Sequence, residues 1–209
     1  MLGLSLPVMV ARALVLVIAL PLHELAHALT ADYLGDPTPR RMGRITLNPL
    51  KHLDPAGTIM LFLAGFGWAK PVMVQPLNMR GDPRRSMAIV AIAGPLTNIT
   101  LAVLASIPFQ LGWAEYTWTV SGNVPTWDFF LSQFVWINLI LAFFNLLPIP
   151  PLDGSRILFA IVPAEMAYQL RPLEQYGFII LFALIFLVPG FERLFITPSL
   201  TILGLLGLI

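Results

Sequence analysis

The sequence predicts an all-α polytopic membrane protein with about five transmembrane helices in a single domain, residues 1–209. Two observations carry this prediction. Of the 209 residues, 57% are hydrophobic and only 11% are charged, whereas roughly a quarter of the residues in a soluble domain are charged. The apolar residues also form long runs, several of which approach the roughly 20 residues that a helix needs to cross a bilayer. We therefore treat lipid as the solvent of most of the chain.

The first predicted helix covers residues 5–33 and ends near Gly35. Its length exceeds one membrane crossing, so its second half lies close to the loop that follows. Residues 10–22 also have the character of a signal-peptide core. The N-terminal segment carries a single basic residue, Arg12, however, and apolar residues resume at Ala28. These two facts favour a helix that stays in the membrane.

The next segment, residues 36–85, is mixed in character and contains one short apolar piece at residues 57–69. This piece is too short for a comfortable span and includes Gly65 and Gly67. We expect a short re-entrant or β-hairpin element between the first and second spans, as is tolerated where such a segment packs on protein. His52 and Asp54, which precede it, are interpreted as surface or loop-stabilising residues rather than as metal ligands.

The later spans are separated by prolines and short loops. A second span is expected at residues 86–111, where Gly94 and Asn98 are interpreted as a close packing point and an interhelical hydrogen bond. A third is expected at residues 129–147. The prolines at 148, 150 and 151 must end the helix there, because proline lacks the backbone donor and clashes with the preceding turn. Fourth and fifth spans are expected at residues 173–188 and 194–209.

Basic residues predict the orientation of these spans. Eight lie between the first and second spans: Arg40, Arg41, Arg44, Lys51, Lys70, Arg80, Arg84 and Arg85. Residues 112–128 hold none. Because loops rich in Lys and Arg stay in the cytoplasm, the first loop is predicted to be cytoplasmic. The arginines are interpreted as topology signals and contacts to anionic lipid.

The most informative motif is His23-Glu24-Leu25-Ala26-His27, in the inner half of the first helix. Two histidines at i and i+4 share a helix face and can bind one metal ion, and the glutamate beside them is placed to act as general base toward water. Ionisable groups inside a membrane are costly, so a functional role is the default explanation. The chain has no cysteine and only three histidines, which excludes a disulfide framework and the many-histidine di-iron sites.

A catalytic zinc site needs a third protein ligand beside an open position. The best candidate is Asp153, which follows the proline-broken span and precedes Gly154, a residue that permits a tight turn. The competing interpretation makes Asp153 a helix N-cap. Asn145 carries an amide that can donate to an oxyanion, although it can equally form an interhelical hydrogen bond.

Together these motifs resemble the site-2 protease family of intramembrane zinc metalloproteases. In that family HExxH lies on one membrane helix and N-x-x-P-x-x-P-L-D-G ends another, and this chain carries the two patterns at residues 23–27 and 145–154. Further segments similar to the family are Gly94-Pro95-Leu96-Thr97-Asn98, Gly67-Trp68-Ala69-Lys70-Pro71-Val72 and Asn48-Pro49-Leu50-Lys51-His52-Leu53-Asp54-Pro55.

The resemblance covers about residues 5–160, and it makes residues 173–209 accessory helices of a short prokaryotic type without PDZ or CBS domains. It implies that His23, His27 and Asp153 bind one Zn²⁺ per chain, that Glu24 is the catalytic base, and that Asn145 contacts the substrate or the oxyanion.

The predicted function is an intramembrane zinc endopeptidase that cuts in or near transmembrane segments of membrane proteins. Its partners are a transmembrane protein substrate and membrane lipid; a net charge of +1 argues against nucleic acid. The predicted location is a prokaryotic inner membrane, with the active site toward the cytoplasm. Two alternatives stay open: a catalytically silent protein that binds client helices around a structural metal, and a divalent-metal transporter. Residues 57–74 either pair with an unwound substrate strand or only pack as a plug.

Overall fold

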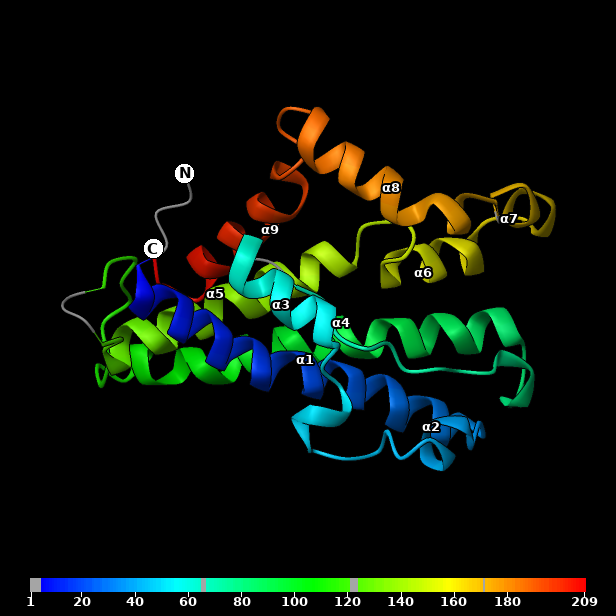
Figure 1. The fold of residues 1–209 in the computed structure, drawn as a ribbon, viewed down its shortest axis with the longest axis horizontal. Coiled ribbons are helices and arrows are strands. Elements are labelled where there is room, and N and C mark those ends of the chain that lie inside the picture. Colours follow the sequence, from blue (N-terminus) through cyan, green and yellow to red (C-terminus); the bar gives the residue numbers. More distant parts are fainter. Residues whose placement is uncertain (1–4, 65–66, 121–123, 171) are drawn as a thin grey trace.

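The computed structural model describes residues 5–64, 67–120, 124–170 and 172–209, and within these ranges it contains helices and no strand (Figure 1). In chain order the elements are α1 (Leu6–Leu34), α2 (Thr38–Arg41), η1 (Pro49–Lys51), α3 (Pro55–Ala64), η2 (Pro76–Asn78), α4 (Pro83–Gln110), α5 (Trp127–Asn145), α6 (Asp153–Ile161), α7 (Ala164–Leu170), α8 (Pro172–Leu187) and α9 (Arg193–Leu205). The prediction of an all-α protein is thus confirmed for the part of the chain that the structure describes.

Three of these helices, α1, α4 and α5, are long and apolar enough to cross a membrane. Figure 1 shows them running alongside one another, and α4 packs against α1, α5 and α6. The buried face of α1 is made largely of small residues: Ala11, Ala19, Ala28 and Ala31 are fully buried. Small side chains let membrane helices approach closely. The three helices therefore form the frame that positions the rest of the molecule.

The ends of the long helices agree with the prediction to within three residues. α1 ends at Gly35, which has a left-handed φ of 112° and donates its N–H to carbonyls in the last turn. α4 begins after Asp82, whose side chain accepts hydrogen bonds from the backbone of Arg84 and Arg85, as an N-cap residue does. Both helices also contain proline in their interior, which helices packed in a membrane tolerate.

The count of five spans is not confirmed. α8 has 16 residues and α9 has 13, at the places where the fourth and fifth spans are expected. Among the described residues three helices qualify as spans, or four if α7 and α8 are counted as one bent span. α8 and α9 pack on the connection between α5 and α6, where Leu181 of α8, Phe191 before α9 and Phe195 of α9 contact Leu147 and Leu152.

A re-entrant or β-hairpin element is predicted between α1 and α4, and the β-hairpin is not confirmed. α3 occupies its first half, and residues 67–75 then return as a non-helical segment with one isolated bridge, from Leu53 to Ala69. Gly65 lies outside the described residues. A local helix forms because a sequence of α-forming apolar residues follows the Asp54 cap, whose side chain accepts from the Gly57 backbone at 2.9 Å.

Asp36 ties this segment to the end of α1. Its fully buried carboxylate accepts hydrogen bonds from Thr38, from the Gln75 backbone at 2.7 Å and from the Asn78 amide at 3.0 Å. Burial acts to raise the pKa of Asp36, but these donors outweigh it and leave the pKa below its usual value. The returning segment is therefore anchored close to the helix that carries the two histidines.

Candidate active site and metal centre

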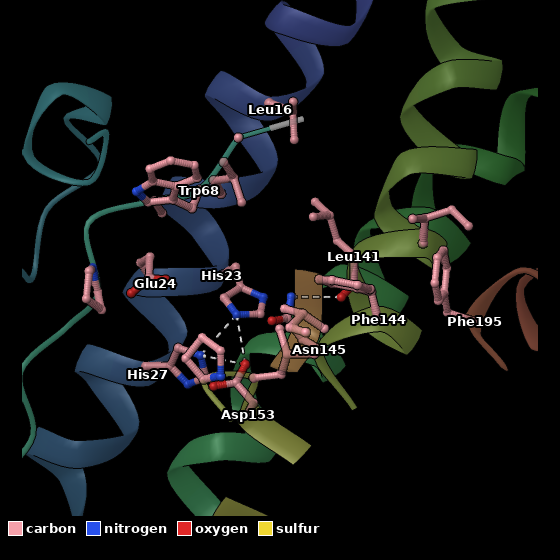
Figure 2. Close-up of a pocket in the computed structure, with 18 of the residues that line it drawn as sticks. Leu16, His23, Glu24, His27, Trp68, Leu141, Phe144, Asn145, Asp153 and Phe195 are labelled. Carbon is pink, nitrogen blue, oxygen red and sulfur yellow. Dashed lines mark hydrogen bonds and ion pairs between the residues drawn. The ribbon is translucent and has the colours of Figure 1, made fainter. Parts of the chain in front are cut away.

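Three side chains from two helices converge on one point (Figure 2). His23 Nε2 lies 3.1 Å and His27 Nε2 lies 3.3 Å from the same oxygen, Oδ2 of Asp153, and the two histidine nitrogens are 3.0 Å apart. A tetrahedral zinc ion with ligand bonds of about 2.0–2.1 Å needs ligand atoms about 3.3 Å from one another. The distances among His23, His27 and Asp153 match that requirement. These three residues form the group of possible metal ligands found among the described residues.

The three candidate ligands come together through the packing of α1 against α4 and of α4 against α6. The histidines share a face of α1, and Asp153 is the first residue of α6, with Leu152 in the N-cap position. Asp153 is therefore not the N-cap residue of α6, and that interpretation is wrong. Its carboxylate faces the two histidines. The break in the chain falls at the prolines, as predicted, between the end of α5 and the start of α6.

Gly154 has a different role from the one expected. It is helical, and it is not among the glycines with positive φ. A Cβ at this position would lie 2.2 Å from the carbonyl oxygen of Leu146. Glycine is needed because the start of α6 passes directly against the end of α5, and this contact holds Asp153 near the bundle.

The second nitrogen of each histidine determines which tautomer the ring adopts. His27 Nδ1 lies 2.7 Å from the carbonyl oxygen of Val90 on α4. A carbonyl only accepts hydrogen bonds, so Nδ1 must carry the proton. The lone pair of Nε2 is then free for a metal ion, as in most histidine ligands.

A chain of two amides does the same for His23. Asn138 donates from Nδ2 to the carbonyl of Phe134 at 2.8 Å, which places its Oδ1 toward Asn98. Asn98 donates to that oxygen at 2.8 Å and presents its own Oδ1 to His23 Nδ1 at 2.5 Å. His23 therefore donates from Nδ1 and keeps Nε2 unprotonated. The sequence indicated only the interhelical bond of Asn98, and the contact with His23 is an addition.

Gly94 also acts at the metal centre rather than only in packing. A Cβ at this position would lie 2.5 Å from both His23 Nε2 and His27 Nε2. The backbone of α4 at Gly94 is thus in direct contact with the two imidazole rings. In the sequence, the signal for a role of Gly94 at the site is its place in the family-like segment Gly94-Pro95-Leu96-Thr97-Asn98.

Glu24 lines the same cavity as the three ligands, on the side of the returning segment (Figure 2). Its Oε2 accepts a hydrogen bond of 3.0 Å from the backbone N–H of Val72. A carboxylate has two oxygens and about four acceptor positions. The contact therefore orients Glu24 and leaves Oε1 available to water.

Arg44 holds the segment that carries Val72 in place through hydrogen bonds to backbone carbonyls. Its guanidinium donates to the carbonyl of Lys51 at 2.5 Å and to the carbonyl of Lys70, and only 4% of the residue is exposed. The interpretation of Arg44 as a lipid contact is therefore wrong. It joins the loop before α3 to the strand-like segment that carries Val72, and sequence reasoning missed it because its charge resembled a topology signal.

The other residues predicted for the site have local partners. Asn145 lies beside Asp153 in Figure 2, but its Nδ2 donates to the carbonyl of Leu141, one turn back on α5, at 2.9 Å. His52 is fully buried, with Nε2 2.9 Å from the carbonyl of Thr46. His52 and Asp54 lie outside the metal-ligand group, in agreement with a loop-stabilising role. The surface alternative is wrong for His52, because the residue is fully buried.

The metal centre opens into a cavity of about 830 Å³. Its walls come from α1, α4, α5, α6, α8, α9 and residues 67–74, and most of the lining side chains are apolar. Most ligand cavities in proteins are smaller than this or of similar size. The space is large enough for several residues of an unwound peptide chain.

Comparison with known proteins places these features in a family. The family model described as peptidase family M50 matches residues 118–188. The "Putative zinc metalloprotease YwhC" of Bacillus subtilis (strain 168) is 43% identical over 176 residues, which are 83% of this chain and 78% of that protein. The "Putative zinc metalloprotease Rip2" of Mycolicibacterium smegmatis is 34% identical over 180 residues, 85% of this chain and 66% of that protein. Rip2 of Mycobacterium tuberculosis (strain H37Rv) is 31% identical over 175 residues, 82% of this chain and 64% of that protein. No solved structure matches the chain.

Proposed function

Because the chain belongs to peptidase family M50, the site-2 protease family, we propose that it is an intramembrane zinc endopeptidase. Its substrate is a membrane protein that it cuts in or near a transmembrane segment. The observation that carries the proposal is the triangle of His23, His27 and Asp153, with ligand atoms 3.0–3.3 Å apart at the wall of a large cavity. These three residues hold one Zn²⁺.

When bound, the zinc ion supplies a Lewis acid that polarises the scissile carbonyl and acidifies the attacking water. Glu24 accepts the proton of that water on Oε1 and delivers it to the leaving amine, while Val72 keeps the carboxylate oriented through Oε2. The Nδ1 contacts of His23 and His27 hold both rings in the ligand orientation throughout.

Two further residue groups contact the substrate in this proposal. Asn145 binds the substrate carbonyl or the oxyanion, for which its amide must turn away from Leu141. Residues 67–74, the non-helical part of the 57–74 element, run beside the cavity and pair with the unwound substrate strand by strand addition. Gly67→Pro should then impair cleavage more than zinc binding, and equal loss of both would make the segment a structural plug.

We also propose the topology and the domain arrangement. Six basic residues between α1 and α4, together with Arg84 and Arg85 in the first turn of α4, lie on the cytoplasmic side of a prokaryotic inner membrane. The metal centre then lies in the cytoplasmic half of that membrane. Residues 5–160 form the catalytic core of one membrane domain, and residues 173–209 are accessory and supply the remaining spans. Because the chain has no cysteine, Met42→Cys and Trp113→Cys each give a single label site. Impermeant maleimide added to intact cells should label position 113 and not position 42.

The activity test uses the full chain in detergent with a single-pass helical substrate. Wild type, Glu24→Gln and the exposed matched control Glu165→Gln are compared for cleavage and zinc content. We expect Glu24→Gln to keep zinc and to cleave about 10²- to 10⁴-fold more slowly, while Glu165→Gln behaves as wild type. A Glu24→Gln protein that keeps zinc and cleaves normally would refute the mechanism. Zinc binding without cleavage of any substrate would favour a client-binding protein, and zinc flux through vesicles a transporter.

A further inference from the structure

The face of α1 that carries Glu24 continues outward to a charged residue. Leu20, Leu16 and Arg12 precede Glu24 at intervals of four residues, so they lie one above another on the same helix face. All of them line the cavity of the metal centre. At 1.5 Å per residue, Arg12 lies about 16 Å from His23 along the helix axis. The cavity therefore has the metal ligands at one end and an arginine at the other.

Arg12 has little compensation for its charge within the protein. Its one hydrogen bond among the described residues runs from Nε to Gln133 Oε1 on α5 at 3.5 Å, which is long for such a bond. None of the ion pairs formed by the described residues includes Arg12. Glu24 and Asp153, the carboxylates of the catalytic site, belong to the opposite end of the cavity. An arginine in an apolar span is costly and normally has a functional partner.

We propose that Arg12 is a specificity-determining residue that binds the carboxylate of an acidic side chain in the transmembrane segment of the substrate. The inference rests on the proposed protease function and adds a substrate class to it. Arginine pairs well with carboxylates because its planar donors match the two oxygens. A substrate segment lying in the cavity would bring such a group to Arg12 and exclude water from the pair.

The length of the cavity defines where the acidic residue lies. A distance of about 16 Å corresponds to about eleven residues of helix or about five residues of extended chain. A substrate that is unwound at the scissile bond and helical beyond it falls between these limits. The acidic residue therefore lies about five to eleven residues from the scissile bond, on the side that faces the loop between α4 and α5.

The test scans one glutamate along a single-pass substrate, from two to fourteen residues from the cut, with glutamine at the same position as reference. The full chain with zinc is assayed in vesicles of phosphatidylcholine. For wild type, kcat/KM for glutamate over glutamine should peak at about ten- to a hundredfold within the window of five to eleven residues. Arg12→Gln should remove the peak, Arg12→Lys should keep part of it, and Arg12→Glu should favour lysine at the same position.

Two controls separate this inference from the protease function itself. Arg156→Gln changes an arginine that lines the metal end of the same cavity, and it should leave the peak in place. Zinc content of the Arg12 variants should equal that of wild type. A flat profile in wild type, or a peak that survives Arg12→Gln, overturns the inference even though cleavage that depends on Glu24 continues. Loss of activity in Arg12→Gln only with phosphatidylglycerol vesicles would also overturn it, because Arg12 would then bind a lipid phosphate.

Discussion

Gly94→Ala should destroy the metal centre although alanine is the better helix former. The added Cβ would lie 2.5 Å from Nε2 of both His23 and His27, where ordinary contact begins at 3.4 Å. Both rings would have to withdraw by about 0.9 Å, and metal-ligand distances tolerate only about 0.2 Å. A displacement near 1 Å can cost about a hundredfold in activity. We expect zinc affinity and cleavage each to fall at least about a hundredfold, or about 2.7 kcal/mol.

The matched control is Gly204→Ala in α9, where a Cβ would meet no atom within 4 Å. In a helix interior this change favours alanine by about 1 kcal/mol, so helix propensity favours Gly94→Ala, and Gly204→Ala, in the last turn of α9, gains less. Zinc is measured by atomic absorption after gel filtration, and its affinity by competition with a chelator. Gly204→Ala should match wild type in zinc content and cleavage. If Gly94→Ala also binds zinc with unchanged affinity and cleaves normally, the close contact between α4 and the histidines is refuted.

Three other changes test the surroundings of the site. Asn98→Leu removes the acceptor of His23 Nδ1 and should lower zinc affinity about 10- to 100-fold, measured by chelator competition; unchanged affinity would contradict the two-amide chain. Val72→Pro removes the donor to Glu24 and should slow cleavage with zinc retained; cleavage at the wild-type rate would make the Val72 contact incidental. Asp36 has a lowered pKa in the folded protein, so its stabilising effect is present above the unfolded pKa of about 3.9 and is lost as pH falls through the folded pKa. The difference in Tm between wild type and Asp36→Asn should therefore shrink on acidification below about pH 4, and a difference that grows would refute this sign.

Sequence reasoning worked best for features that belong to one helix. The spacing of His23 and His27 determines that they share a face, because helix geometry alone fixes the direction of side chains four residues apart. The apolar runs identified α1, α4 and α5 in the same way, since the length of a membrane crossing is a property of one segment. The break at the prolines before Asp153 followed from the chemistry of proline itself.

The sequence was less informative where the structure of a segment depends on which other segments pack against it. Hydropathy does not show what α8 packs against. In the structure α8 packs on the α5–α6 connection. The 57–74 element has the length of a hairpin, but hairpins need a partner strand, and only the single bridge from Leu53 to Ala69 forms among the described residues.

By itself, the sequence determined the family, the two histidines, the glutamate beside them and the approximate place of the third candidate ligand. Only the tertiary structure decided that Gly94 supports both histidine rings, that Asn98 selects the tautomer of His23, and that Arg44 is buried rather than bound to lipid. It also placed Arg12 in the same cavity as the metal ligands. The physical reason is that each of these contacts joins segments far apart in the chain, and their relative positions come from the packing of α1, α4, α5 and the returning segment.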